Sequence, residues 1–176
     1  GVPKDHAQAV AWYRKAAEQG DADAQFFLGI YYGERLHGLR SRDIRAYEDF
    51  KEALLWTRKA AEQGLAEAQD AMGLLCFLSG DSAQGVAWYR KAAEEGNKSA
   101  QLHLGELYAE GRKMDRDYVE AYKWLDLAAS RASGEPYPGA AKSRDTVAKK
   151  MTSTQKAEAQ QRAREWAEAF EKQRDK

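Results

Sequence analysis

The sequence has little proline, a single cysteine and few runs of β-branched residues. Only 3 of its 176 residues are proline, while Ala, Glu, Lys, Arg and Gln dominate. This composition favours helices nearly throughout and excludes a substantial sheet. Cys76 cannot form an intramolecular disulfide, so cysteine usage fits a reducing compartment without excluding an oxidising one.

An excess of charge of one sign and long apolar runs are also missing. Lysine plus arginine and aspartate plus glutamate number 28 each, which leaves a net charge of 0. A neutral chain has no basic field to attract nucleic acid or an anionic membrane. No apolar run is long enough to span a bilayer, and no signal peptide begins the chain. We therefore expect neither a nucleic-acid partner nor membrane insertion.

What the sequence does contain is one segment in four versions. It reads AWYRKAAEQG at 11–20, LWTRKAAEQG at 55–64, AWYRKAAEEG at 87–96 and KWLDLAASRA at 123–132. The tryptophans Trp12, Trp56, Trp88 and Trp124 are 44, 32 and 36 residues apart, a period of 36 lengthened once by eight and shortened once by four. Periods of this size mark stacked supersecondary units. The tryptophans are predicted to be core residues.

A second frame precedes the tryptophan segment and predicts the first helix of each unit. Ala24, Leu28, Gly29 and Tyr32 lie at helical spacing, and the frame recurs at 68–76 and 100–108. Gly29 is expected to let the neighbouring helix approach closely. Each unit is therefore predicted to be a helical hairpin.

The repeats divide the chain into one array over residues 1–176. We assign 1–20 to the second helix of a truncated repeat, with Asp5 as its N-cap, and 21–64, 65–96 and 97–132 to repeats. Because the first helix of the pair at 1–20 is missing, we expect the chain to be the C-terminal part of a longer protein. The eight extra residues within 33–50 are predicted to form a loop.

The C-terminal segment 137–176 is predicted to cap the array, because the last apolar face of a stacked array must be covered. Asp81 or Ser82 should cap an earlier helix, and Thr152 with Gln155 three residues later is a capping-box signature. The capping box should open a long last helix. The buried stripe of that helix is predicted at Ala159, Ala163, Trp166, Ala167 and Phe170.

The pattern AxxxLGxxY followed by AxxWYxKAAxxG resembles the Sel-like repeat (SLR), a relative of the tetratricopeptide repeat. The resemblance covers nearly the whole chain, and residues 144–166 look like the closing cap common in bacterial Sel-like repeat proteins. It implies an all-α fold, a right-handed α/α solenoid of stacked helical hairpins with a C-terminal capping helix. Cys76 for Tyr, Gly85 for Ala and Thr57 for Tyr depart from the pattern.

The resemblance also implies a function. Family members act as non-catalytic scaffolds or adaptors that bind a protein or peptide, here on the concave face. The alternative is a bacterial immunity protein that masks a secreted toxic effector enzyme. A cysteine-rich branch associated with β-lactamase activity carries regular cysteine pairs, which this chain lacks. The resemblance favours the bacterial periplasm or cell envelope as the compartment, with the cytoplasm as the alternative.

Two sets of residues are candidates for binding another protein. In a superhelix of this family, off-stripe residues of the first helices would face the concave surface, unless neighbouring helices bury them. These are Phe26, Ile30, Asp70, Leu74, Phe77, Leu102 and Glu106. The second set belongs to the insertion and would contact an acidic partner, unless it consists of solvated loop charges. It comprises Arg35, Arg40, Arg42 and Arg45.

No set of residues points to catalysis. His6, His37 and His103 lack metal-ligand spacing, and Cys76 fits a small core residue. The sequence has no glycine-rich phosphate loop and no nucleophile elbow. We therefore predict no catalytic residues, no cofactor and no metal. A hydrolase acting on cell-wall or β-lactam substrates has no motif behind it.

Overall fold

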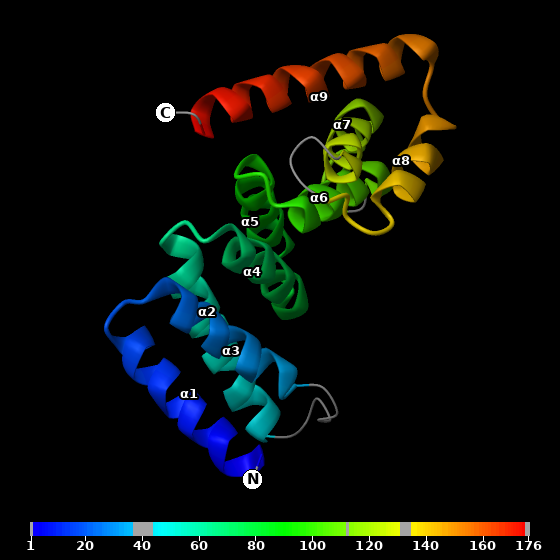
Figure 1. The fold of residues 1–176 in the computed structure, drawn as a ribbon. Helices are drawn as coiled ribbons and strands as arrows, with labels where there is room; N and C mark the ends of the chain where they lie inside the picture. The colour runs from blue at the N-terminus through cyan, green and yellow to red at the C-terminus, as the bar shows by residue number, and fades with distance from the viewer. Residues whose placement is uncertain (1, 37–43, 112, 131–134, 175–176) are drawn as a thin grey trace. The chain divides into compact units, whose positions relative to one another are not determined.

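The computed structural model describes residues 2–36, 44–111, 113–130 and 135–174, with side chains from residue 8 onward. These residues form nine helices and no strand, which confirms the predicted all-α class (Figure 1). The helices are α1 (Val2–Glu18), α2 (Ala22–Glu34), α3 (Ile44–Glu62), α4 (Ala66–Ser79), α5 (Ser82–Glu94), α6 (Lys98–Glu110), α7 (Tyr118–Ala129), α8 (Ala140–Ala148) and α9 (Ser153–Arg174). They fall into two compact units, 1–79 and 80–176, called unit 1 and unit 2 below.

In unit 1 each helix packs against the next one along the chain. Trp56 of α3 is buried in a cluster with Ala17 of α1 and Leu28 of α2. A Cβ on Gly29 would overlap the Thr57 hydroxyl of α3, so only glycine allows this approach of α2 to α3. The predicted close approach is confirmed.

A buried glutamine near the start of each first helix fastens it to the helix before. Its side-chain amide donates to the carbonyl of an alanine eight residues earlier. This carbonyl lies in the last turn of the preceding helix, where carbonyl groups have no partner within the helix. The pairs are Gln25 with Ala17 at 3.0 Å, Gln69 with Ala61 at 3.4 Å and Gln101 with Ala93 at 3.2 Å. Hydrophobic patterning passed over these residues because they are polar.

Unit 2 ends in the predicted cap. Thr152 and Gln155 exchange two hydrogen bonds, from the Thr152 N–H at 2.9 Å and from the Gln155 N–H at 3.2 Å, so the capping box is confirmed. Figure 1 shows α9 as the long helix beside α7. The ring of Trp166 lies edge-on to Trp124, with 5.9 Å between centroids. Ala159 is fully buried, as its place on the predicted stripe requires.

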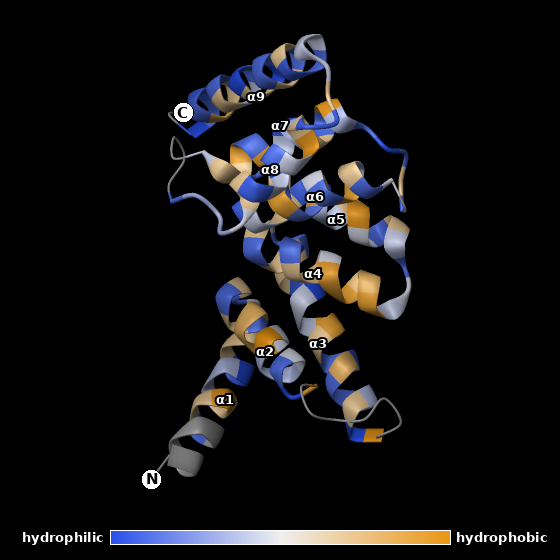
Figure 2. Ribbon diagram, turned by 90° about the vertical axis from the view of Figure 1, so that its right-hand side faces the viewer, coloured by the Kyte–Doolittle hydropathy of each residue, from blue (hydrophilic) through white to orange (hydrophobic). Residues whose placement is uncertain are grey.

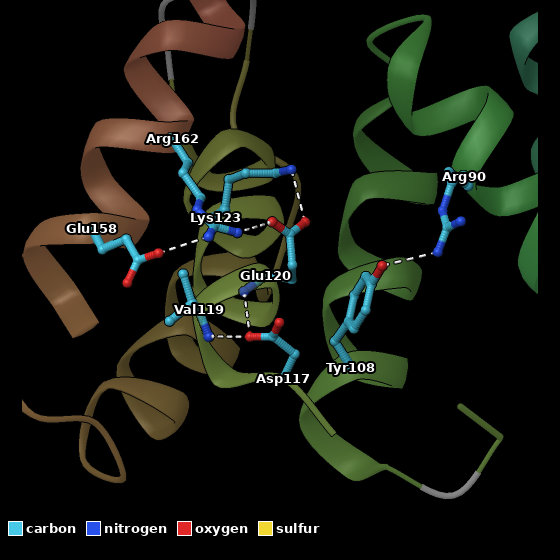
Figure 3. Close-up of polar contacts among 8 residues, drawn as sticks. All are labelled: Arg90, Tyr108, Asp117, Val119, Glu120, Lys123, Glu158 and Arg162. Carbon is cyan, nitrogen blue, oxygen red and sulfur yellow. Dashed lines mark hydrogen bonds and ion pairs between the residues drawn. The ribbon is translucent and has the colours of Figure 1, made fainter. Parts of the chain in front are cut away.

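An ionic network fastens α9 to α7 (Figure 3). The carboxylate of Glu120 accepts from Lys123 and from Arg162, both at 2.8 Å, and Arg162 also binds Glu158 at 2.6 Å. Burial acts to raise the pKa of Glu120, but the hydrogen bonds and charges of Lys123 and Arg162 outweigh it and hold that pKa below its usual value. Glu120 is therefore a charged residue of the cap interface.

The structure corrects two predicted boundaries. Helix α1 begins at Val2, three residues before the predicted N-cap Asp5, because Pro3 fits a first helical turn, where its missing N–H has no cost. The insertion is not one loop, since α3 already begins at Ile44 and has 19 residues against 13 in α5. The segment IRAYEDF contains no Gly or Pro and continues the helix.

The tryptophans are core residues only in part. Trp56 and Trp124 are each 4% exposed, as predicted, and Trp88 is half-buried. The prediction is wrong for Trp12, whose side chain is 70% exposed. Trp56 is covered by Ala17 of α1 and by Ala24 and Leu28 of α2, the first helix of its own hairpin.

Candidate interaction surface

Helix α4 turns one apolar face outward. Its Ala68, Met72 and Cys76 are buried, with Cys76 in the core as expected. On the other side Leu74 is 51% exposed, and Leu78, one turn later, is 64% exposed. Figure 2 colours the C-terminal half of α4 almost wholly as hydrophobic, whereas α9 is largely hydrophilic. Leu78 was missed from the sequence, although its spacing of four from Leu74 would have indicated it.

The candidate residues beside these two are partly covered. Asp70 and Phe77 of α4 are half-buried, and so is Phe26 of α2, while Ile30 of α2 is 43% exposed. Helix α3 packs against both α2 and α4, so the two first helices belong to the same unit. Of the predicted apolar residues in unit 1, Ile30 and Leu74 are therefore the exposed ones.

The two candidates on α6 have partners inside unit 2. Leu102 packs, half-buried, against the core cluster of that unit, and Glu106 accepts a hydrogen bond from the Ser143 hydroxyl of α8 at 2.9 Å. An open pocket of about 610 Å³ lies beside them on α6, α7 and α8. Its lining includes Glu106, Glu110, Arg116, Leu125, Lys142 and Lys150. Charges of both signs therefore surround a small apolar floor.

The four arginines of the insertion do not form one described cluster. Arg35 donates to Asp49 at 3.0 Å and to Tyr31 at 3.1 Å, and the hydrogen bond to Asp49 contributes most to raising the pKa of its guanidinium. Because Asp49 is buried, this pair joins the end of α2 to the lengthened α3. Arg45 is exposed on α3 itself. Arg40 and Arg42 lie outside the described residues.

An arginine two positions after the tryptophan binds a tyrosine of the next helix in two of the repeats. Arg14 donates to the Tyr32 hydroxyl, and Arg90 donates to that of Tyr108 at 2.9 Å (Figure 3). Arg58 is the equivalent arginine of the repeat between these two. Its partner position is 76, where cysteine replaces tyrosine. Arg58 is exposed and, within the described part of the chain, forms no hydrogen bond or ion pair.

An open pocket of about 520 Å³ adjoins α3 in unit 1. Arg14 and Tyr32 line it together with Glu48, Lys51 and Leu55 of α3. No group of three or more His, Cys, Asp or Glu side chains in the described ranges could hold a metal ion. None of the helices described above is both long and apolar enough to cross a membrane. His103 lies half-buried against Tyr89, with 4.7 Å between ring centroids.

The sequence profile of the Sel1 repeat matches the chain four times, at residues 1–21, 22–65, 66–97 and 98–133. Two solved structures share the fold at 29% identity. One is a protective antigen of uropathogenic Escherichia coli with an SLR fold (TM-score 0.61, covering 93% of this chain and 41% of that one). The other is a Sel1 repeat protein of Oxalobacter formigenes (TM-score 0.60, covering 86% and 67%). Among curated proteins, none matches the chain.

Proposed function

Because the chain belongs to the Sel1-repeat family, we propose that it is a scaffold that binds another protein or peptide through the outward faces of α2 and α4. Proteins with these repeats generally mediate protein–protein interactions, and the family is generally non-catalytic. Both solved relatives are bacterial, in agreement with the expected bacterial origin. The chain spans only 41% of the length of the Escherichia coli antigen. A role as a scaffold for other proteins is therefore proposed for this chain and is not taken over from that antigen.

The observation that carries this proposal is the pair of exposed leucines on α4. Leu74 and Leu78 follow each other by one helical turn and leave about half or more of their side chains in water. An apolar row at this spacing suits alternate side chains of an extended peptide or one face of a partner helix. Ile30 adds a third exposed apolar residue, and Phe26, Phe77 and Asp70 would line its borders.

The two candidate residues of α6 already have contacts inside unit 2. Leu102 contributes its half-buried side chain to the core of unit 2, and Glu106 is hydrogen-bonded to Ser143. Both are therefore expected to contribute less to partner binding than the residues of α4. We assign the partner to the concave face that the resemblance to the family implies.

The test is an affinity capture from the native organism, analysed by mass spectrometry, with the wild type and a Leu74→Asp, Leu78→Asp variant. Both residues are exposed, so the variant should keep the helical circular dichroism of the wild type. It should lose the dominant partner of the wild type. A Tyr137→Asp variant, which changes an exposed aromatic residue of unit 2, should retain that partner.

An unchanged partner list for the α4 variant would contradict the proposed surface. The affinity for the purified partner then distinguishes the two functions expected from the family. Several partners held at micromolar affinity would support an adaptor. A single enzyme held at nanomolar affinity or tighter would instead identify the immunity role and contradict a general scaffold.

A further inference from the structure

The lengthened helix α3 carries a straight stripe of exposed residues that belongs neither to the core nor to the first-helix faces. Ile44 is 77% exposed, Tyr47 62% and Leu55 47%. Lys51 and Arg58 are exposed between and after them. At 3.6 residues per turn these five positions fall within a sector of roughly 80° and extend over about 21 Å. We call them the α3 stripe.

The rest of α3 explains why this stripe stays in water. Asp49, Ala53, Trp56, Thr57, Ala60 and Ala61 are buried, so the helix already uses another side for its core contacts. Single exposed apolar residues are common on proteins, but three large ones aligned on one helix face are typical of an interaction surface. The stripe depends on the insertion, because Ile44 and Tyr47 lie among the residues by which α3, with 19 residues, exceeds α5, with 13.

The two charged residues of the stripe, Lys51 and Arg58, are both cations. The Lys51 ammonium lies 4.9 Å from the centre of the Tyr47 ring, and Arg58 has lost the tyrosine partner of its repeat position. No carboxylate lies within the stripe itself. Glu62 follows it one turn after Arg58, and Glu48 borders it in the 520 Å³ pocket.

We propose that the α3 stripe is a second docking surface, which receives an amphipathic helix of a partner protein whose apolar side is flanked by Asp or Glu. Apolar residues of the partner pack between Ile44, Tyr47 and Leu55, and its carboxylates meet Lys51 and Arg58. A second copy of this chain fits less well. An antiparallel pair centred on the stripe would place Lys51 against Lys51 of the other copy, and like charges in an interface oppose binding.

The first test uses the full chain and two fluorescent helical peptides of about 18 residues, or five turns. Both carry leucine along one face, flanked by glutamate in one peptide and by lysine in the other. Fluorescence anisotropy should show the glutamate peptide binding at least about tenfold more tightly than the lysine peptide. Added salt should reduce that ratio, because exposed charges are screened.

Variants then locate the binding site. Tyr47→Asp should abolish binding of the glutamate peptide, and Lys51→Glu with Arg58→Glu should reverse the preference between the two peptides. Arg164→Glu, a matched charge reversal on the exposed side of α9, should leave both affinities unchanged. Leu74→Asp should do the same, which separates this surface from the one proposed on α4. Since every altered residue is exposed, circular dichroism should show wild-type helicity in each variant.

Three results would overturn the inference. The first is equal binding of the two peptides, or binding of neither. The second is full binding by the Tyr47→Asp variant, or an unreversed preference in the folded double charge variant. The third is a dimer of the wild type in sedimentation equilibrium that Tyr47→Asp disperses, because the occupant would then be a second copy.

Discussion

Units 1 and 2 are built from the same repeat but use their apolar residues differently. Among the described residues, every exposed large hydrophobic side chain except Tyr137 lies in unit 1. Unit 2 folds α8 and α9 onto its last hairpin, so Trp124 meets Trp166 and Leu102 joins a core cluster. In unit 2 the helices of the cap cover apolar residues of the last hairpin, whereas the helices of unit 1 leave several large apolar side chains exposed and available to a partner.

The largest difference in stability is expected between alanine variants of the first and the last repeat tryptophan, Trp12 and Trp124. Trp124→Ala in unit 2 removes a buried ring and should lower the free energy of unfolding by about 3–5 kcal/mol. Trp12→Ala in unit 1 removes an exposed ring and should change it by less than about 0.5 kcal/mol. Urea titrations measure both values. Similar losses for the two variants would contradict the difference in burial.

Two glycine substitutions should change stability in opposite directions. A Cβ on Gly105 in unit 2 would lie 2.7 Å from Leu125 Cγ and 3.1 Å from the Ala121 carbonyl oxygen. Gly105→Ala should therefore cost about 1–3 kcal/mol through overpacking. In unit 1, Gly33 of α2 has no atom within 4 Å of a built Cβ, so Gly33→Ala should add up to about 1 kcal/mol. Thermal unfolding should show the lower midpoint for the Gly105 variant.

Acid should weaken the cap of unit 2 through Glu120. Its pKa in the folded chain lies below the ordinary value of 4.5, so its charge contributes stability above about pH 4.5. That contribution is lost as the pH falls through the lower, folded-state pKa. The wild type should be modestly more stable than Glu120→Gln at pH 7, and this difference should shrink when the pH is lowered to 3. Urea midpoints at both pH values test this, and a difference that persists in acid would exclude the charge as its cause.

The smallest effect on stability is expected at the exposed residues of unit 1. Ile30→Ser, Leu74→Ser and Leu78→Ser should each change the free energy of unfolding by less than about 1 kcal/mol, because much of each side chain is already in water. Binding of a hydrophobic dye to the native protein should fall in each variant. A stability loss as large as that of a core residue would show that these side chains are covered in solution.

Much of the architecture could be predicted because it is local. Period, helix spacing and the Thr152–Gln155 capping box each depend on residues close in sequence, and the structure confirms the helices and the box. Burial depends instead on what lies next to a helix. The segment AWYRKAAE occurs around Trp12 and again around Trp88, yet Trp12 is exposed and Trp88 is half-buried.

The candidate surface was predictable only in part for the same reason. Leu74 and Glu106 occupy equivalent positions in the repeat, but Glu106 is half-buried and accepts a hydrogen bond from Ser143 of α8, a helix that departs from the repeat pattern. The extension of α3 was missed because an insertion has no second copy whose spacing could show that it is helical. Arg58 was missed because its lack of a tyrosine partner follows from a substitution elsewhere, at Cys76.

The buried glutamines also indicate where the gene for such an array can gain or lose codons. The spacing of eight residues from the alanine carbonyl to the glutamine is the same in all three copies, whereas the added and missing residues of those repeats lie between the first and second helices. The connection from a second helix to the next first helix is longer only between α7 and α8. There Ala141 occupies the position that glutamine has in the other first helices. A reporter peptide or a new binding loop is therefore best grafted after a first helix, where the hydrogen bond that joins one hairpin to the next stays intact.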